Sequence, residues 1–276
     1  LDFNEKAKSD PTVITDASSV AFIQCVGSRN DENPYCSRIC CTQSIQKAVN
    51  LKKQNPDQDV FILYRDIRTY ADKEVLYKEA RDLGVIFIKY TRDSRPEVSL
   101  NGSDLIVKAF DPVLQMDVEI NVDLLVLASA IVPNDTNPFV EMFKCSANAD
   151  GFLMEAHPKL RPVDSNVDGV FLAGMCHYPK PIDEAIAQGR ASASRAITLL
   201  AKETINTSGT VAETEPAICS SCGVCVSICP YSAPSFIDAD ARMFAGKAQI
   251  NPVLCKGCGL CVASCRSGAI RLKGFD

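Results

Sequence analysis

The chain is 276 residues long, a length that allows about two domains. Its composition is 46% hydrophobic and 23% charged with a net charge of −5, which is ordinary for a globular protein and excludes the basic character of nucleic-acid binding. The longest apolar run, residues 124–133, is too short for a transmembrane segment, and the polar N-terminus predicts no signal peptide. The 14 cysteines are clustered, unlike those of a small disulfide-stapled secreted scaffold, so we expect a cytoplasmic protein.

Residues 1–18 are polar, and we expect a tail or linker there. The following segment alternates short apolar runs with amphipathic ones. Strands are expected at 20–24, 60–64 and 85–88, and helices at 41–53 and 73–83. Gly84 follows the second helix, at the usual position of a C-terminal glycine. This β-α-β-α-β order with short links predicts a parallel, doubly wound α/β sheet.

The pattern changes at Asp104. Residues 105–107 and 118–120 alternate in polarity around a turn, as the strands of a hairpin do. Continuous apolar strands are expected at 124–128 and 169–174, and a long alanine-rich helix at 182–200. Residues 202–215 are rich in Thr, Ser, Glu and Gly, which predicts a linker, placed at 205–214, before the last part of the chain.

That last part, residues 215–276, contains two copies of C-x2-C-x2-C-x3-C, the first followed by Pro230. This is the bacterial two-cluster ferredoxin pattern, in which the fourth cysteine of each run ligates the other cluster. The first predicted [4Fe-4S] cluster has the ligands Cys219, Cys222, Cys225 and Cys265. The second has the ligands Cys255, Cys258, Cys261 and Cys229. The alternative is a pair of zinc sites, because C-x2-C also suits zinc.

A third group of cysteines follows the first predicted strand. Cys25 comes directly after that strand, and Cys36, Cys40 and Cys41 complete a C-x10-C-x3-C-C pattern. An ordinary Rossmann-type domain has G-x-G-x-x-G here to bind a pyrophosphate, but this segment offers only Gly27. Nicotinamide binding is therefore not expected. A third cluster is the simplest interpretation, and a redox disulfide or buried inert thiols are the alternatives.

Two segments around this third group are distinctive: FIQCVGSR at 22–29 and PYCSRICC at 34–41. Together with residues 66–69, 157–164 and 171–174, they closely resemble the A-subunit family of heterodisulfide reductases. The resemblance covers roughly residues 18–276. It implies that Cys25, Cys36, Cys40 and Cys41 are the ligands of a [4Fe-4S] cluster, which makes three clusters in the chain.

The resemblance also implies an α/β fold built as a thioredoxin-reductase-like three-layer core, followed by an α+β ferredoxin domain with two [4Fe-4S] clusters. The nicotinamide-type, Rossmann-like domain would span residues 19–103 and carry the third cluster. Residues 104–204 would form the C-terminal, closing part of an FAD-binding domain. Residues 205–214 would be the linker, and residues 215–276 the ferredoxin domain.

The glycine-rich opening half of the family's FAD domain has no counterpart in this sequence. FAD would therefore be shared with a complementary chain or an upstream half. Gly174 and Met175 align with the family's flavin-contacting loop, and Ile182 and Asp183 open the helix that would face the flavin. Gln46, followed by Lys47, replaces a lysine that related sequences place near the flavin, and Lys180 is a candidate substitute.

Two cysteines and both histidines lie outside these motifs. Cys145 and Cys176 have no partner in the sequence, and we expect a buried structural thiol at Cys145. Cys176 lies beside the proposed flavin loop, where a redox role is the less favoured interpretation. His157 and His177 have no neighbours at metal-ligand spacing, so we expect structural roles for both.

The resemblance implies an electron-transfer oxidoreductase subunit without catalytic side chains of its own. It would relay electrons between FAD, a disulfide-reducing partner and ferredoxin. Electron bifurcation is a weaker expectation than the fold, because Gln46 carries no charge where related sequences have a lysine. Expected partners are other heterodisulfide-reductase-like subunits, the chain supplying the FAD half, and a hydrogenase or formate dehydrogenase module. The alternatives are a quinone-linked or aromatic-ring-reducing complex with the same wiring, or a non-catalytic zinc–thiolate scaffold.

Overall fold

The computed structural model describes residues 5, 8–102, 104–204, 209–237 and 246–274. The chain divides into two compact units. The first contains residues 1–135, 147–153 and 173–189, and the second contains residues 136–146, 154–172 and 190–276. In the described part of the chain, no helix combines the length and the apolar character that crossing a bilayer requires.

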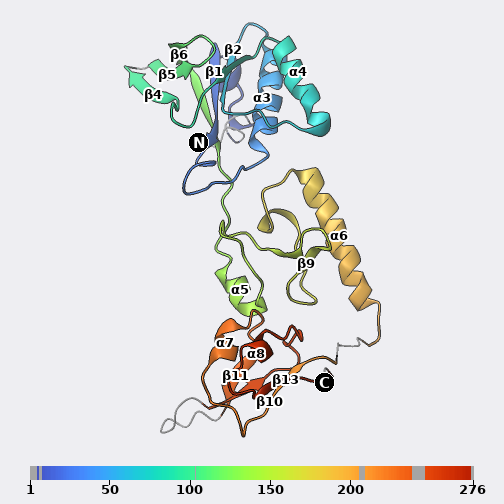
Figure 1. Ribbon diagram of the computed structural model, residues 1–276. Helices are drawn as coiled ribbons and strands as arrows, with labels where there is room; N and C mark the ends of the chain where they lie inside the picture. Colours follow the sequence, from blue (N-terminus) through green and yellow to red (C-terminus); the bar gives the residue numbers. More distant parts are fainter. Residues whose placement is uncertain (1–4, 6–7, 103, 205–208, 238–245, 275–276) are drawn as a thin grey trace. The chain divides into compact units, whose positions relative to one another are not determined.

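The first unit is built on a four-stranded parallel sheet with the order β3-β2-β1-β7 (Figure 1). Its strands are β1 (Ser19–Val26), β2 (Asp59–Tyr64), β3 (Ile86–Lys89) and β7 (Leu124–Ser129). The central strands are buried on both faces, which explains their continuous apolar sequences. The expected strands and their parallel order are confirmed.

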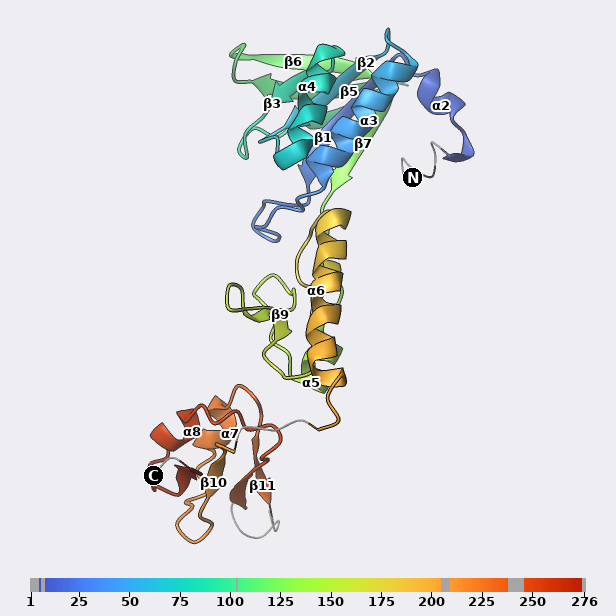
Figure 2. The ribbon, with the colours of Figure 1, turned by 90° about the vertical axis from the view of Figure 1, so that its right-hand side faces the viewer.

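The sheet is covered on both faces, which makes three layers (Figure 2). On one face lie α3 (Cys40–Gln54) and α4 (Glu74–Asp82), the latter preceded by the short 3-10 helix η1 (Ala71–Lys73). The other face carries an antiparallel sheet of β4 (Glu97–Asn101), β5 (Asp104–Asp111) and β6 (Met116–Val122). Strand β1 serves both cores: Phe22 packs with the helices, and Ile23 packs with the antiparallel sheet.

The expected boundary at residue 103 is wrong. Strands β5 and β6 cover the parallel sheet, and β7 pairs directly with β1, with Phe22 opposite Val126. These strands therefore belong with residues 19–101 and not with the closing part of an FAD domain. The boundary was misplaced because the hairpin pattern that begins at Asp104 looks like the start of a new domain until its packing against the parallel sheet is known.

The expected N-terminal tail is also partly structured. Among its described residues, helix α2 (Thr12–Thr15) packs against the first core through Ile14, and Ala17 is buried nearby. The side-chain nitrogen of Gln58 donates hydrogen bonds to the carbonyls of Ile14 (2.9 Å) and Ala17 (2.7 Å). These bonds hold the segment on the domain.

The middle of the chain has little regular structure. It contains α5 (Asn137–Phe143), the β8–β9 hairpin (Glu155–His157 and Arg161–Ser165) and the 3-10 helix η2 (Gly174–Cys176). Residues 169–174, expected as a strand, form only an isolated bridge between Phe171 and Asp164 before η2 begins. The long helix α6 (Ile182–Leu200) has the expected bounds.

The C-terminal part consists of two small antiparallel sheets and two short helices. β10 (Ala212–Thr214) pairs with β13 (Ile270–Leu272), and β11 (Pro234–Ile237) pairs with β12 (Lys247–Ile250). Helices α7 (Val224–Ile228) and α8 (Leu260–Ala263) each follow a left-handed glycine, which gives the two halves matching geometry. The expected linker therefore ends early, because β10 and the buried Ala212 belong to this fold; its residues 205–208 lie outside the described residues.

Candidate functional site

The C-terminal fold encloses two small cavities, each lined by four cysteines. One cavity is lined by Cys219, Cys222, Cys225 and Cys265. The other is lined by Cys229, Cys255, Cys258 and Cys261. In each cavity, three cysteines come from one sequence run and the fourth from the other run. This is the crosswise grouping expected from the spacing, and both donor sets fit a four-iron cluster.

Backbone groups in these loops approach the sulfurs. The N–H groups of Ala212 and Gly257 lie 3.3 Å and 3.5 Å from the Cys255 sulfur. Gly257 has a positive φ of 61°, and a Cβ atom there would lie 2.4 Å from the Thr210 carbonyl oxygen. Only glycine allows this approach, so the sequence around Cys255 is shaped for amide contacts to an anionic sulfur site.

The cysteines are not gathered for a single ion. Within the described ranges, no group of three or more His, Cys, Asp or Glu side chains is close enough to hold one metal ion. Four sulfurs around one zinc ion must converge, because each Zn–S bond is only about 2.3 Å long. A four-iron cluster is a larger group than a single ion, so its four sulfurs lie further apart.

The third group of cysteines lies at the carboxyl end of the parallel sheet. Cys25 lies within β1, where the pairing with β7 shifts register, and adopts a left-handed conformation (φ 60°); pairing resumes at Val26, opposite Ser129. Cys40 and Cys41 form the first turn of α3, and Cys36 precedes them in the connecting loop. Parallel strands and the helices that follow them meet at this edge, so the topology brings these four cysteines together.

The thiols interact with one another electrostatically. Burial is the largest cause of the raised pKa of Cys25, and the nearby sulfurs of Cys41 and Cys36 raise it further. The Cys40 thiol donates a hydrogen bond to Cys41; this bond raises the pKa of Cys40 and lowers that of Cys41 to about 7. These interactions link Cys25 with Cys36 and Cys41, and Cys40 with the other three cysteines.

Polar neighbours complete this site. The Arg29 guanidinium lies 4.0 Å from the Cys25 sulfur and pairs with the Asp66 carboxylate at 2.6 Å. The hydrogen bond from Arg29 lowers the pKa of Asp66. The backbone N–H of Arg38 lies 3.3 Å from the Cys36 sulfur. Donors and positive charge at the sulfurs suit an anionic cluster. The Arg29–Asp66 ion pair could not be predicted from sequence spacing, because the two residues lie in loops that follow different strands, β1 and β2.

A polar network runs from the third cysteine group to the start of α6. The Arg38 side chain donates to the Pro179 carbonyl (3.2 Å) and to Glu184 (2.9 Å), and the Tyr70 hydroxyl also donates to Glu184. Lys73 pairs with Asp183 at 3.0 Å. None of these links was expected from the sequence, because no motif connects residues so distant in the chain.

The expected flavin-contacting residues do not all lie together. The Gly174 N–H donates to Gln188 (2.9 Å), Met175 is exposed, and Ile182 is 78% exposed at the start of α6. Lys180 is buried, and its amine lies 3.1 Å from His177 Nδ1 and 2.5 Å from Gln188 Oε1. Gln46 instead bonds Asn50 along α3, with Lys47 beside it on the same helix. The structure therefore groups Gly174 with Lys180 and not with Gln46.

The remaining cysteines and His157 have local partners. Cys145 is buried and accepts a hydrogen bond from Ser165 at 3.4 Å. Cys176 is exposed, with its sulfur 3.2 Å from the Ala173 carbonyl. His157 Nδ1 accepts the backbone N–H groups of Lys159 and Leu160, both at 3.1 Å. These contacts suit structural roles for Cys145 and His157.

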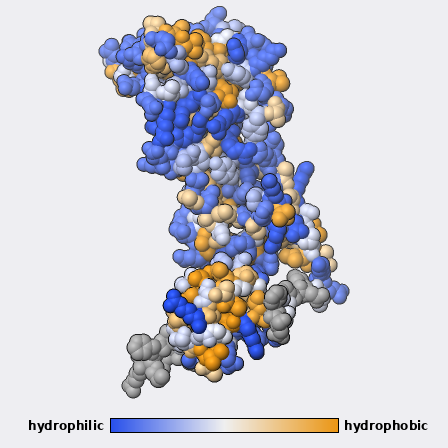
Figure 3. Space-filling view, viewed as in Figure 1, coloured by the Kyte–Doolittle hydropathy of each residue, from blue (hydrophilic) through white to orange (hydrophobic). Residues whose placement is uncertain are grey.

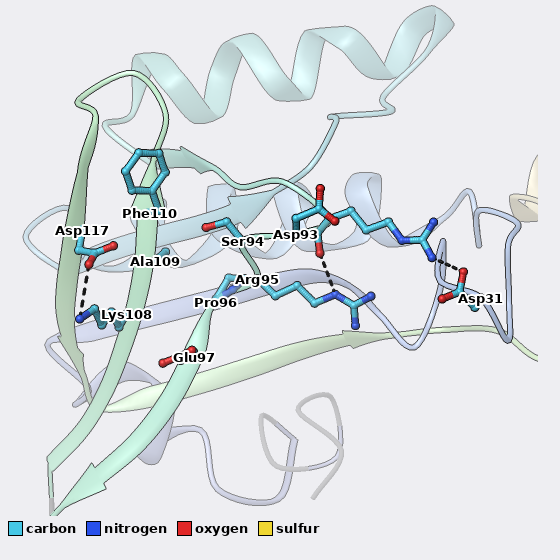
Figure 4. Close-up of a pocket in the computed structure, with 11 residues that line it drawn as sticks. Asp31, Asp93, Ser94, Arg95, Pro96, Glu97, Lys108, Ala109, Phe110 and Asp117 are labelled. Carbon is cyan, nitrogen blue, oxygen red and sulfur yellow. Dashed lines mark hydrogen bonds and ion pairs between the residues drawn. The ribbon is translucent and has the colours of Figure 1, made fainter.

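A larger cavity of about 1120 Å³ lies beside the antiparallel sheet, and it contains no cysteine (Figure 4). Its walls mix cations and anions, including the Arg92–Asp31 and Lys108–Asp117 ion pairs. Asp31 belongs to the loop between Cys25 and Cys36, so the first pair fastens the cysteine loop to the domain. We assign this cavity no ligand.

Known proteins support the architecture. The family model of a 4Fe-4S dicluster domain matches residues 218–269. The iron-sulfur A-subunit 2 of CoB–CoM heterodisulfide reductase from Methanopyrus kandleri is 40% identical over 229 residues, which cover 81% of this chain and 35% of that protein. The A-subunit of H2:CoB-CoM heterodisulfide,ferredoxin reductase from Methanothermobacter thermautotrophicus is 40% identical over 231 residues, covering 81% of this chain and 34% of that protein.

Among solved structures, thioredoxin reductase of T. acidophilum aligns with a TM-score of 0.49 and 14% identity, covering 71% of this chain and 57% of that one. The chain spans about a third of the length of the curated relatives that it matches. The extent and level of sequence identity show that this chain belongs to the A-subunit family of heterodisulfide reductases.

Proposed function

We propose that this chain is the electron-relay part of a heterodisulfide-reductase-like flavoprotein and holds three [4Fe-4S] clusters. The observation that carries the proposal is the grouping of the C-terminal cysteines around two cavities, each in the crosswise ligand set of a two-cluster ferredoxin. Each cluster, when bound, would supply one-electron chemistry. The side chains position the clusters, and we assign no catalytic acid or base to this chain.

The third proposed cluster has Cys25, Cys36, Cys40 and Cys41 as ligands. The support is their mutual electrostatic contact at one sheet edge, together with Arg29 beside the Cys25 sulfur. The guanidinium would offset part of the negative charge of four thiolates and the cluster core. Asp66 would keep the guanidinium in place.

We further propose that FAD binds between this chain and a complementary polypeptide or upstream half. Most of α6 lacks cover: Ser192 is its one buried residue among those described, while Ile186, Ile197 and Leu200 are exposed. Exposed apolar side chains on one helix are typical of a surface that another element covers. Gly174 and Lys180 would then lie at the flavin, with Met175 and Ile182 beside them.

The C-terminal unit, meaning here the fold formed by residues 209–237 and 246–274, would pass electrons to or from a soluble carrier such as ferredoxin. Its surface carries apolar side chains on the face shown in Figure 3, and Ile218, Val253 and Leu260 are among its exposed residues. Small apolar patches are common at transient docking sites. A disulfide-reducing partner chain and a hydrogenase or formate dehydrogenase module would complete the path, in a cytoplasmic complex.

Anaerobic purification followed by iron, acid-labile sulfide and flavin analysis tests the proposal. Three four-iron clusters predict about 12 iron atoms and about 12 sulfides per chain. A value of about 8 would remove the third cluster, and zinc without sulfide would remove all three. Flavin should appear only when the complementary half co-purifies, and identification of the co-purified chains names the partners.

A further inference from the structure

The two cysteine-lined cavities of the C-terminal fold differ in the polar side chains beside their cysteines. The cavity that contains Cys222 and Cys265 is called the first cavity here, and the cavity that contains Cys255 and Cys258 the second. Three serines also line the first cavity: Ser220, Ser221 and Ser267. The polar side chains in the lining of the second cavity include Tyr231 and Lys256. The first cavity therefore offers small hydroxyl groups to whatever its cysteines bind.

Two of these serines lie at positions that have a direct counterpart in the other cysteine run. Ser220 follows the first cysteine of its run, and the counterpart in the second run is Lys256. Ser267 lies two residues after the last cysteine of its run, and its counterpart is Tyr231. Because the spacing of the cysteines is the same in both runs, the repeated pattern itself does not require a serine at either position.

Both of these serines form hydrogen bonds with cysteine sulfurs of the first cavity. The Ser267 hydroxyl lies 3.6 Å from the Cys265 sulfur. Burial alone would raise the pKa of the Cys265 thiol, but hydrogen bonds lower it, and the one from Ser267 has the largest effect among them. The backbone N–H of Val224, followed by the Ser220 hydroxyl, lowers the pKa of the Cys222 thiol. A hydrogen bond lowers a thiol pKa when it favours the thiolate, so both hydroxyls act as donors to sulfur.

The binding of a cluster fixes the direction of these two hydrogen bonds. A cysteine that ligates iron is a thiolate and has no proton to donate, whereas a serine hydroxyl can either donate or accept. Each hydroxyl is then the donor at its sulfur. A reduced cluster carries one more negative charge than an oxidised one, so a donor at a ligand sulfur stabilises the reduced form more than the oxidised form.

We propose that Ser220 and Ser267 raise the reduction potential of the [4Fe-4S] cluster in the first cavity, by donating hydrogen bonds to the ligand sulfurs of Cys222 and Cys265. The inference rests on the proposed two-cluster function of the C-terminal fold. The two serines belong to different cysteine runs and contact different sulfurs, so their effects should accumulate. The cluster in the second cavity has a serine at neither matched position, so only the first cluster gains these donors.

The test is a potentiometric titration, followed by electron paramagnetic resonance, of the protein isolated anaerobically together with its partners. A double variant with Ser220→Ala and Ser267→Ala removes both hydroxyls, and because both serines are exposed it leaves no buried void. We expect iron to stay at about 12 atoms per chain while one cluster becomes about tenfold harder to reduce at a fixed potential, equivalent to about 59 mV for one electron. Each single variant should give about a threefold effect, and the other two clusters should titrate as in the wild type.

Ser227→Ala is the matched control, because this serine lies in the same cysteine run but its hydroxyl donates to the Val224 carbonyl at 2.9 Å. It should leave all three potentials unchanged. The single variants give a second readout if the double variant loses iron. Full iron content with unshifted potentials in the double variant, or in both single variants, overturns the inference alone. Zinc without sulfide in the wild type overturns the C-terminal clusters and the inference with them.

Discussion

The two cysteine regions of this chain are organised differently. The C-terminal cysteines lie in short local loops whose backbone amides contact the sulfurs, and the cysteines themselves form much of the small core there. The Cys25 group instead lies at the edge of a sheet that has a separate apolar core on each face. In the C-terminal region the cysteines are part of the core, whereas in the sheet domain they lie at the edge of cores that other residues form.

The difference predicts opposite dependence on metal. A region with few buried apolar residues cannot offset its loss of chain entropy without its clusters. The parallel sheet domain buries Phe22, Ile45 and Ile62 along with many others, so we expect its fold not to depend on the proposed third cluster. The following experiments test this contrast, beginning with the largest expected effect.

Iron removal by a chelator should unfold the C-terminal unit and spare the sheet domain. Cys225 is one of its few buried core residues, and further cysteines pack against that core. In hydrogen-exchange mass spectrometry, protection should disappear from α7 and α8 and persist in β1 and β2. Retained protection in α7 after complete iron loss would contradict the contrast.

Loss of a ligand in the sheet domain should be local. Cys41→Ala should lower the iron content from about 12 to about 8 atoms per chain, with the melting transition of the domain retained. Cys145→Ala is the control, because its thiol contacts Ser165 and lies outside all three groups; it should keep all the iron. Equal iron loss in the two variants would contradict the ligand assignment.

The loop at Gly257 should tolerate no side chain. Gly257→Ala combines a left-handed backbone with a Cβ atom 2.4 Å from a carbonyl oxygen, so we expect loss of the cluster assigned to Cys255, Cys258, Cys261 and Cys229. Gly268→Ala is the matched control: its φ is also positive, at 67°, but nothing lies within 4 Å of the added atom. It should cost only about 1–3 kcal/mol of backbone strain and keep its iron.

Asp66→Asn should have the smallest effect. The Asp66 side chain is half exposed, so its pair with Arg29 is worth under about 1 kcal/mol. Because the folded-state pKa of Asp66 is depressed, its contribution is present above the ordinary aspartate pKa of about 3.9 and is lost as pH falls through the lower folded value.

Denaturant titrations of the metal-free full chain check this prediction. Wild type and Asp66→Asn should differ slightly at pH 6 and converge near pH 2. Asp93→Asn provides a control, since it removes an aspartate from a different loop. A difference in stability between wild type and Asp66→Asn that grows as the pH falls would contradict the predicted loss of the ion pair's contribution at low pH.

The sequence alone determined the local features of this protein. Short cysteine spacings, apolar runs and the limits of α6 each arise from residues close together in the chain, so the eight C-terminal cysteines and the main elements could be predicted. Specific local motifs also led to the family, which the relatives confirm.

Only the tertiary structure decided how distant segments combine. Strand β7 joined β1 and not a second domain, Asp66 came to hold Arg29 beside Cys25, and the side-chain amide of Gln24 was buried without a hydrogen-bond partner among the described residues. Sheet pairing, ion pairs and buried polar groups depend on residues that meet only after folding. No spacing rule along the chain encodes such meetings, because the hydrogen bonds and packing that select them act across space.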